Sequence, residues 1–254
     1  MATWNVNSIR QRLDHLVKWA KEASPDVICL QETKVTNDKF PAAAIAAAGY
    51  PHQLIDGQKS YNGVAILSRL PLMAPQKGFS VDPDPQKRFI AATVDGIRLF
   101  CCYVPVGTAV GSEKFTYKLD WFDRILNELN GSCQPDDKVV VCGDLNVAPD
   151  DASVWDPFAL EGHLLFHPAE REALEKLIDW GLVDAYRQKN PFGGAFSWWD
   201  YRGGAFNRNL GLRIDHHLIS KPLAEVCQKV TIWREVRGWN QPSDHVPVVV
   251  DFGL

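Results

Sequence analysis

The chain has 254 residues, a mass of 28.5 kDa and a hydrophobic fraction of 46%. These values are typical of one large α/β domain with a substantial core, and no linker-like or low-complexity stretch divides residues 1–254. The formal net charge of −4 offers no general attraction for nucleic acid. A locally basic rim can nevertheless coexist with a cluster of carboxylates, so the charge does not exclude a nucleic-acid partner.

We find no signal peptide, no lipidation motif and no apolar run long enough to span a bilayer. A soluble, cytoplasmic protein without a membrane partner is therefore expected. Four of the six cysteines fall in expected strands, and none has C-x-x-C spacing. We interpret the cysteines as small buried hydrophobic residues in a reducing compartment, not as disulfides or zinc ligands.

The first half of the chain alternates short apolar strands with helices. Residues 1–6 indicate a strand. Asn7 or Ser8 can cap the helix that follows, which has apolar residues at helical spacing and is ended by Pro25. An alanine-rich helix follows Pro41 and ends at Gly49. Further strands are expected at 26–30, 64–67, 89–94 and 97–103, and Asp95-Gly96 between the last two predicts a hairpin.

The second half contains two amphipathic helices, expected at 113–130 and 169–180. Between them lie a Val-rich strand that begins at Val139 and an irregular stretch, 150–168. Another strand begins near Asp215, and residues 248–252 form the last one. Hairpin and helix connections are mixed among at least eight strands. Two packed sheets with helices outside accommodate this pattern better than one wound parallel sheet.

The Val-rich strand ends in Asp144-Leu145-Asn146, where polar residues follow a buried apolar run. Residues i and i+2 of an extended chain point the same way, so Asp144 and Asn146 are expected side by side at the carboxyl end of this strand. Ligands of α/β sheets bind at such ends. The alternative is that Asp144 caps the following turn and Asn146 merely tolerates its backbone angles.

Two other strands end in polar residues, and the C-terminal tail adds a histidine. The first strand leads into Asn5-Val6-Asn7, the second into Glu32 and Lys34, and Asp244-His245 precedes the last strand. Carboxylates, amides and a histidine at one mouth of a buried sheet outline a site for metal-assisted hydrolysis. A surface turn is the alternative for Asp244 and His245.

Residues 196–217 interleave aromatic residues with arginines and glycines. This composition suits a loop that holds a phosphate backbone and stacks on bases or wedges between them. Core packing is the alternative for Trp198 and Trp199, and one of the two is expected to be core. Basic residues in or near expected loops extend the same surface, although about half are alternatively ordinary solvated charges: Lys34, Lys87, Arg88, Lys114, Lys118, Arg202, Arg208 and Arg213.

Six segments in this order resemble the exonuclease III type of DNA-repair nuclease, within the endonuclease/exonuclease/phosphatase superfamily that includes deoxyribonuclease I. They are residues 4–10, 30–34, 61–65, 143–146, 211–215 and 243–245, and they span nearly the whole chain. The resemblance implies a four-layer α/β sandwich, in which helices flank two packed mixed β-sheets. It also implies Mg²⁺, with Mn²⁺ as a substitute, and a monomer that cleaves nucleoid DNA.

Position by position, the resemblance implies Glu32 as the main metal carboxylate, with Asn7 beside it and Asp244 as a further contact. Mg²⁺ takes one or two protein carboxylates and completes its octahedron with water and phosphate oxygen. Asp144 resembles the residue that orients or deprotonates the attacking water, and Asn146 resembles the one that holds the nucleophile or phosphate.

His245 resembles the phosphate-contacting histidine, oriented by Asp244, and a neighbouring carboxylate should raise its pKa. Tyr103 matches the family tyrosine at the phosphate, with plain core packing as the alternative. Asn5 and Asp215 resemble residues that fix the others in place. The residues expected to face DNA are Asn5, Lys34, Arg88, Trp198, Arg202, Arg208, Leu212 and Ile214.

Trp198, Leu212 and Ile214 align with the apolar pocket that receives a base-free deoxyribose in relatives. The neighbouring segment 161–168 is bulky, and His163 stands where some relatives have a phosphate-contacting asparagine. A crowded pocket would disfavour internal abasic sites in duplex DNA and favour blocked or recessed 3′ ends. The expected activities are abasic-site incision, 3′–5′ exonuclease and 3′-phosphatase or 3′-phosphodiesterase.

Two other functions remain as alternatives. A phosphatase or phosphodiesterase of the same superfamily can act on a small molecule, a lipid or RNA, but the aromatic and arginine-rich residues 196–213 favour polymeric DNA. A DNA-binding module without activity is the second alternative. The intact set of Glu32, Asp144, Asn146, Asp244 and His245 argues against it.

Overall fold

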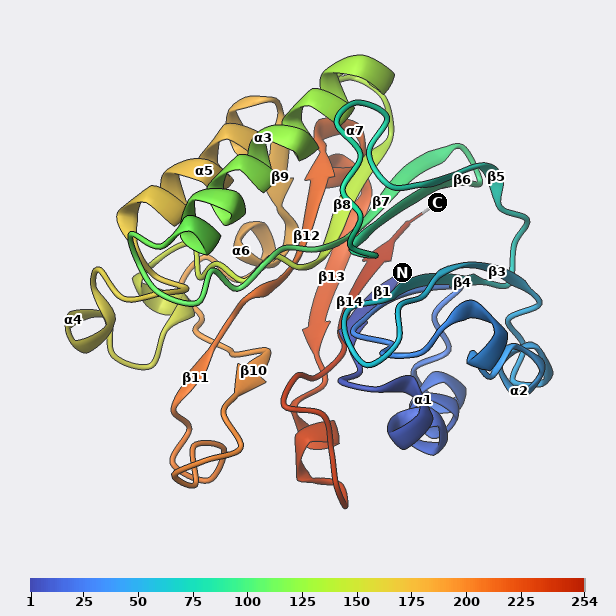
Figure 1. Cartoon of the computed structure of the whole chain (residues 1–254), viewed down its shortest axis with the longest axis horizontal. Helices are drawn as coiled ribbons and strands as arrows, with labels where there is room; N and C mark the ends of the chain where they lie inside the picture. Colours follow the sequence, from blue (N-terminus) through green and yellow to red (C-terminus); the bar gives the residue numbers. More distant parts are fainter. Residues whose placement is uncertain (254) are drawn as a thin grey trace.

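The structure is a computed structural model that describes residues 1–253, and its core is formed by two six-stranded mixed sheets (Figure 1). The strands of the first sheet are, in spatial order, β13 (Cys227–Ile232), β14 (Val248–Phe252), β1 (Ala2–Asn5), β2 (Val27–Gln31), β4 (Val64–Ser68) and β3 (His52–Asp56). The strands of the second sheet are β5 (Met73–Lys77), β6 (Phe89–Val94), β7 (Ile97–Tyr103), β8 (Val139–Asp144), β12 (Asp215–Ser220) and β9 (Leu182–Asp184).

Helices cover the outer face of each sheet (Figure 1). On the first sheet lie α1 (Ile9–Ala23) and α2 (Ala42–Ala47), and on the second lie α3 (Glu113–Ser132) and α5 (Pro168–Asp179). The remaining helices are α4 (Pro157–Leu160), α6 (Ala185–Lys189) and α7 (Lys221–Val226), with single 3-10 turns at Asn37–Lys39, Asp151–Ser153 and Arg234–Gly238. The expected four-layer α/β sandwich is confirmed.

Alternation of side chains along the strands divides the core into layers. Leu99 and Cys101 of β7 face the core between the sheets, whereas Phe100 and Cys102 face the outer helices. Successive side chains of a strand point to opposite faces, so a strand covered on both faces is apolar throughout. This is why the central strands are visible in the sequence as continuous apolar runs.

The hairpin of β6 and β7 is confirmed with the bounds that the sequence predicted. Asp95 (φ 48°) and Gly96 (φ 75°) make the two-residue turn, and both have the positive φ that such hairpin turns need. Within the two sheets, strands β3, β5, β9 and β13 were not predicted from the sequence. Four of the five residues of β5 are exposed, and β9 has only three residues, so neither shows an apolar run.

All six cysteines are buried and free, as expected. Among the described residues, no helix combines the length and the apolar character needed to cross a membrane.

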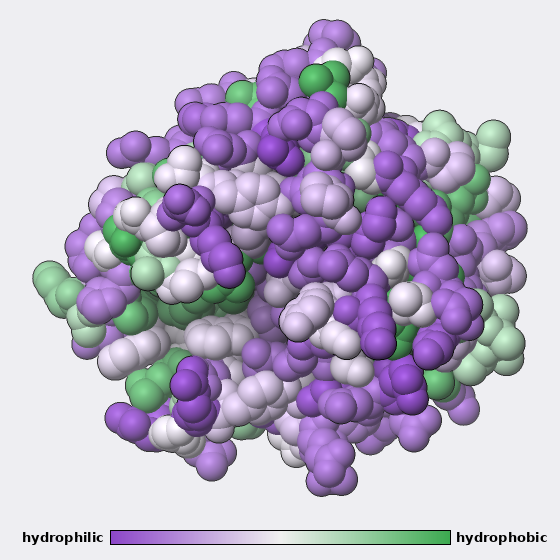
Figure 2. Space-filling model, viewed as in Figure 1, coloured by the Kyte–Doolittle hydropathy of each residue, from purple (hydrophilic) through white to green (hydrophobic). Residues whose placement is uncertain are grey.

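A two-stranded ribbon of β10 (Trp198–Trp199) and β11 (Gly211–Leu212) lies beside the sandwich (Figure 1). Figure 2 shows a largely hydrophilic face with a hollow between α4 and this ribbon, where hydrophobic side chains line the floor. Leu160 of α4 and Leu212 of β11 belong to one apolar cluster there.

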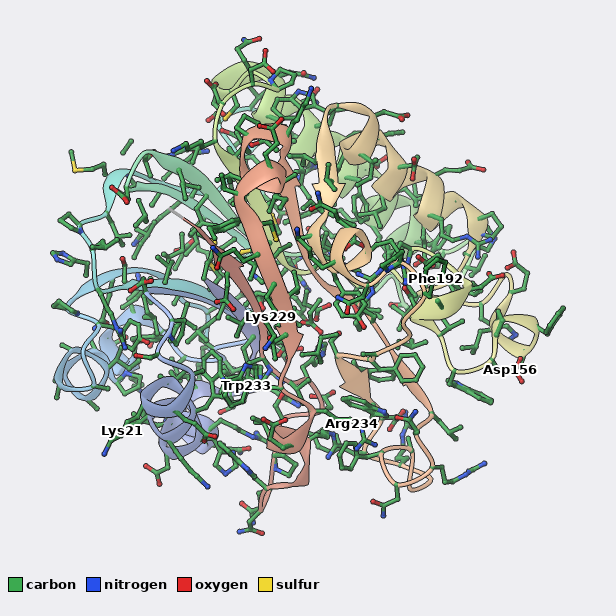
Figure 3. The ribbon with its side chains drawn as sticks, turned by 180° about the vertical axis from the view of Figure 1, so that it is seen from behind. Lys21, Asp156, Phe192, Lys229, Trp233 and Arg234 are labelled. Atoms are coloured by element: carbon green, nitrogen blue, oxygen red, sulfur yellow. The ribbon has the colours of Figure 1, made fainter. Side chains whose placement is uncertain are left out.

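The ribbon is anchored from the turn after β13. Arg234, which follows Trp233 in that turn (Figure 3), lies 4.5 Å from the ring centroid of Phe206 and 5.5 Å from that of Trp199. Trp199 is fully buried, whereas Trp198 is only partly buried. One of the two tryptophans is therefore core, as expected.

Candidate active site

Strand register places three polar residues of the second sheet in one row. Tyr103 of β7 pairs with Asp144 of β8, and Asp144 pairs with Asp215 of β12. From the first sheet, Asn5 at the end of β1 reaches across, with its Nδ2 2.9 Å from Asp144 Oδ2. Side chains that are distant in sequence thus meet at a shared end of both sheets, as the strand ends predicted.

Glu32, the first residue after β2, receives contacts from both sheets. Its Oε1 accepts hydrogen bonds from Asn5 Nδ2 at 3.0 Å and from the Tyr103 hydroxyl at 2.8 Å. Burial raises the pKa of Glu32, but the Lys34 ammonium and these hydrogen bonds outweigh it and hold the pKa below its ordinary value. Glu32 is therefore an ionised carboxylate at neutral pH.

The Lys34 ammonium marks a place for a cation between oxygen ligands. Its Nζ lies 2.6 Å from Glu32 Oε2 and 2.5 Å from Asn7 Oδ1. Asn7 Nδ2 in turn donates to Asp244 Oδ1 at 2.9 Å. Carboxylate and carboxamide oxygens are the ligands that Mg²⁺ prefers. The residues present therefore fit a divalent cation at Glu32 and Asn7, with Asp244 next to them.

Five residues of the site have a positive φ, which is uncommon for residues other than glycine: Asn7 (42°), Ser8 (89°), Glu32 (53°), Lys34 (57°) and Asn146 (52°). Such backbone costs on the order of 1 kcal/mol or more per residue, and it clusters at functional sites. Tight turns after the strands, and not the strands themselves, therefore aim these side chains.

Asn146 shows the effect of such a turn. Strand β8 ends at Asp144, so the extended alternation that was expected to place Asp144 and Asn146 side by side does not reach Asn146. Instead Asn146 N donates to Asp144 Oδ1 at 3.1 Å, and Asn146 Nδ2 donates to Val104 O at 2.9 Å. The left-handed turn therefore brings the backbone amide of Asn146, and not its carboxamide, to the Asp144 carboxylate.

His245 lies between two carboxylates. Its Nδ1 is 2.9 Å from Asp215 Oδ2, and its Nε2 is 3.6 Å from Asp144 Oδ2. Burial alone would lower the pKa of His245, but Asp215 and Asp144 outweigh it and raise the pKa to about 10. The same three residues offer ligand atoms within 4.8 Å of one another, as a metal site would require. In this arrangement the cation between the carboxylates is the imidazolium itself.

Asp144 has the most displaced carboxyl pKa of the site. Burial raises it, His245 lowers it and Asp215 raises it again, with a result of about 7. A carboxyl group with a pKa near the working pH is well placed to accept a proton.

The expectation that Asp244 orients His245 was wrong. Asp215 holds the imidazole, while Asp244 accepts hydrogen bonds from Trp198 Nε1 at 3.0 Å and from Asn7 Nδ2. Consecutive residues of an extended segment point in opposite directions, so Asp244 and His245 serve different neighbours. The fixing role expected for Asp215 agrees with its contact to His245.

Asn5 was expected both to face DNA and to fix other residues. It is fully buried, so it makes no direct contact with a bound duplex, and that expectation is corrected. Its carboxamide instead links Glu32 to Asp144, and its Oδ1 accepts a hydrogen bond from Asn7 N at 3.0 Å. Asn5 therefore acts by positioning the groups around it.

The basic residues expected at a DNA-binding rim differ in their exposure to solvent. Arg202 is 90% exposed in its side chain, and Arg208 is also exposed. Arg88 is half-buried, with its guanidinium 4.4 Å from the ring centroid of Tyr103. Lys118 and Arg213 are buried ion-pair partners of Glu170 and Asp184, so neither belongs to the rim.

Leu212 and Ile214 are buried in an apolar cluster with Phe166, and Trp198 and Leu165 pack against it. Phe166 comes from the bulky segment 161–168. The cluster lies beside the site, because Trp198 also donates to Asp244. Phe166 therefore packs against Leu212 and Ile214, two of the residues that were expected to line a pocket for a deoxyribose.

Arg12 is a further residue of the site that was not predicted from the sequence. Its guanidinium donates to Asn7 O at 2.6 Å and to Pro242 O at 2.9 Å, which joins the turn after β1 to the segment before Asp244. The sequence feature that could have indicated it is the position of Arg12, three residues after Ile9 on the apolar face of α1. A charged residue on such a face indicates a buried group with bonded partners.

The chain is similar to known proteins over nearly its whole length. The model of the Endonuclease/Exonuclease/phosphatase family matches residues 2–245. The chain is 34% identical to exodeoxyribonuclease III of Haemophilus influenzae over 98% of each chain. The structure resembles an AP endonuclease from Archaeoglobus fulgidus, with 40% identity, a TM-score of 0.96 and coverage of 100% of this chain and 98% of that one.

It also resembles the 3′ phosphatase NExo from Neisseria bound to a product DNA hairpin, with 40% identity, a TM-score of 0.95 and coverage of 100% and 98%. This chain therefore belongs to the Endonuclease/Exonuclease/phosphatase family. Its resemblance to the exonuclease III type is confirmed, and within the family it is a hydrolase of the nuclease type.

Proposed function

We propose that this protein is a Mg²⁺-dependent DNA-repair phosphodiesterase that acts on double-stranded DNA, with Mn²⁺ as a substitute ion. The observation that carries the proposal is the continuous hydrogen-bonded connection from Glu32 through Asn5 to Asp144, with the His245 cation beside it. That a structural relative is a 3′ phosphatase bound to a product DNA hairpin supports DNA as the substrate. The protein would act as a cytoplasmic monomer on nucleoid DNA.

One bond change accounts for abasic-site incision, 3′–5′ exonuclease and 3′-phosphatase activity. A water oxygen forms a bond to phosphorus, the bond from phosphorus to O3′ breaks, and O3′ takes a proton from solvent to become a hydroxyl. Asp144, with a pKa of about 7, accepts the proton of the attacking water. A metal ion bound at Glu32 and Asn7 would polarise the phosphate as a Lewis acid.

Two further groups stabilise negative charge on the phosphate. The His245 imidazolium, whose pKa is raised to about 10, stays charged at neutral pH and can donate to a non-bridging oxygen. Burial and the Glu32 carboxylate raise the pKa of Tyr103, so its hydroxyl stays neutral, and its one proton, which it donates to Glu32 Oε1, can turn to the phosphate. Both groups are held in place before substrate arrives, which is the condition for effective charge stabilisation.

Within this function we propose a preference for 3′ ends over internal abasic sites. Phe166 packs against Leu212 and Ile214, and Leu165 packs against the same cluster, so bulky side chains would narrow the space that a flipped deoxyribose enters. A recessed or phosphorylated 3′ end needs no flipping into that space.

A side-by-side assay on three duplexes tests both proposals. The duplexes carry an internal abasic site, a recessed 3′-hydroxyl or a nick with a 3′-phosphate, and each is assayed with Mg²⁺ and with chelator. We expect Mg²⁺-dependent release at both 3′ ends, faster than incision at the abasic site. Faster hydrolysis of inositol phosphate or oligo(A) than of any duplex would show that the substrate class is wrong.

Leu165→Gly tests the crowded cluster by itself. Leu165 has a φ of 73° and packs against the cluster, so glycine removes bulk and also relieves backbone strain. The ratio of abasic-site incision to 3′-phosphate release should rise in this variant. An unchanged ratio would contradict the proposed role of the cluster, while the phosphodiesterase assignment would stand.

A further inference from the structure

A buried ion pair joins the two helices that cover the second sheet. Lys118 of α3 and Glu170 of α5 are both fully buried, and the Lys118 ammonium donates to Glu170 Oε1. Glu170 Oε2 accepts a hydrogen bond from His167 N at 3.0 Å, as part of the cap of α5. The carboxylate is thus held from two sides and cannot turn away from the lysine.

The other two contacts of the Lys118 ammonium go to the active-site loops. Its Nζ lies 2.6 Å from Asn146 O and 3.2 Å from Val106 O. An ammonium group has three donors, and here each has an acceptor. Asn146 belongs to the turn after Asp144, and Val106 to the segment after Tyr103, so one buried cation bridges the loops that follow two catalytic strands.

These loops need such a bridge. Asn146 has a φ of 52°, a strained conformation that persists only when its surroundings determine it. The loop around Val106 runs tightly along the lysine stem, since a Cβ at Gly107 would lie 3.3 Å from Lys118 Cδ. Asn146 Nδ2 also donates to Val104 O, so the two loops are joined directly as well as through the ammonium.

We propose that Lys118 is a positioning residue of the active site: its ammonium holds the backbone of Asn146 and Val106, and Glu170 supplies its counter-charge. The inference rests on the proposed function, because it explains how the Asn146 carboxamide is presented to the scissile phosphate. Removing both charges from water carries a desolvation penalty that a purely structural link between two helices does not require.

A matched surface pair provides the control. Asp123 of α3 and Lys176 of α5 join the same two helices at 2.6 Å, but their side chains are 50% and 48% exposed and lie on the surface. Lys176→Met should leave kcat unchanged. Lys118→Met should lower kcat on the order of 10- to 100-fold, because small displacements of positioned groups cost this much. KM for a DNA duplex should change less than threefold.

Glu170→Gln and the double variant Lys118→Met/Glu170→Gln separate positioning from stability. Glu170→Gln leaves the Asn146 and Val106 contacts, so it should lower Tm strongly but kcat less than threefold. The double variant buries no lone charge, so it should regain most of the Tm lost in Lys118→Met without regaining kcat. Equal losses of kcat in Lys118→Met and Glu170→Gln, or a return of kcat in the double variant, would overturn the proposal.

Amide hydrogen exchange tests the positioning role without requiring turnover. Exchange at residues 104–107 and 145–148 should accelerate in Lys118→Met and in the double variant, and stay slow in Glu170→Gln and Lys176→Met. If the wild-type protein cleaves no DNA, the proposed function fails and this measurement still decides the positioning role. Unchanged exchange in the double variant would refute that role.

Discussion

The two halves of the candidate site differ in their access to solvent. In the half from the first sheet, the side chains of Glu32 and Lys34 are 18% and 28% exposed. In the other half, Asp144 and Asp215 of the second sheet meet His245, which precedes β14 of the first sheet, and these side chains are 2%, 0% and 5% exposed. Both halves bring a positive charge to carboxylates, but only the first does so where ions and substrate can exchange.

The difference assigns separate tasks to the two halves. Water and salt screen the contacts of an open site, so the lysine there can give way to another cation at little cost. Charges in a closed site interact strongly and shift one another's pKa values. Changes in the closed half should therefore alter chemistry and pH dependence, and changes in the open half should alter the requirement for metal.

Asp144→Asn should have the largest effect. The amide keeps the shape of the side chain but cannot accept the proton, so kcat should fall about 10²- to 10⁴-fold. DNA affinity should stay within threefold of wild type, because the expected binding surface lies elsewhere. Single-turnover kinetics and equilibrium binding measure the two quantities, with Asp123→Asn on the surface of α3 as the control. Turnover at the wild-type rate would remove Asp144 from its assigned role.

The pH dependence of stability in Asp144→Asn is a second test of the difference between the two halves. The pKa of Asp144 is raised from an unfolded value of 3.8 to about 7, so the folded state binds more protons in this window. Its contribution to stability is therefore present below about pH 4 and is lost as the pH rises to about 7. His245, raised from 6.5 to about 10, has the same sign in the next window.

Relative to wild type, Asp144→Asn should therefore gain stability between pH 4 and 7, by about 2–4 kcal/mol. Denaturant unfolding of both proteins in chelator, at matched ionic strength, measures this difference. A difference that does not vary with pH would mean that the carboxyl group of Asp144 is not perturbed in the folded protein.

The positions of these groups were predictable from the sequence where strands determine them. Tyr103, Asp144 and Asp215 stand at the ends of central strands, and continuous apolar runs make such strands visible. The exposed edge strand β5 and the three-residue β9 lack that signal and were missed. The sequence thus predicts the centre of each sheet better than its edges.

The contacts between these groups were less predictable, because they depend on turns and on distant partners. The positive φ at Asn146 could not be predicted, because the residue is not a glycine. Likewise, His245 bonds to Asp215 and not to its sequence neighbour Asp244. Lys118 shares the face of α3 with Phe115 and Phe122, so its burial was visible in the helical spacing. Its charge suggested the surface instead.

Glu32→Gln probes the open half. Replacing the carboxylate should raise the Mg²⁺ concentration for half-maximal activity about 10- to 100-fold. Saturating Mg²⁺ should restore part of kcat, which it should not do for Asp144→Asn. Mg²⁺ titrations of both variants and of Glu22→Gln, on the exposed side of α1, provide the comparison. An unchanged midpoint would show that Glu32 is not a metal ligand.

Arg202→Ala and Arg208→Ala should have the smallest effects, since each removes one exposed charge near the β10–β11 ribbon. If each arginine contacts one DNA phosphate, the slope of log K against log salt concentration should flatten by about one for each variant. Lys21→Ala, at the end of α1 (Figure 3), changes the same net charge and should leave the slope unaltered.

Arg202 gives the sharper test of the two. Its guanidinium already pairs with Asp200 at 3.0 Å, and its side chain is 90% exposed. Such an exposed ion pair contributes little to stability, but it must break or rearrange before Arg202 can contact DNA. Asp200→Asn frees the guanidinium and should strengthen binding slightly in wild type but not in Arg202→Ala. Equal effects of Asp200→Asn in both backgrounds would show that Arg202 does not reach the phosphate backbone, whatever the slope for Arg208 proves to be.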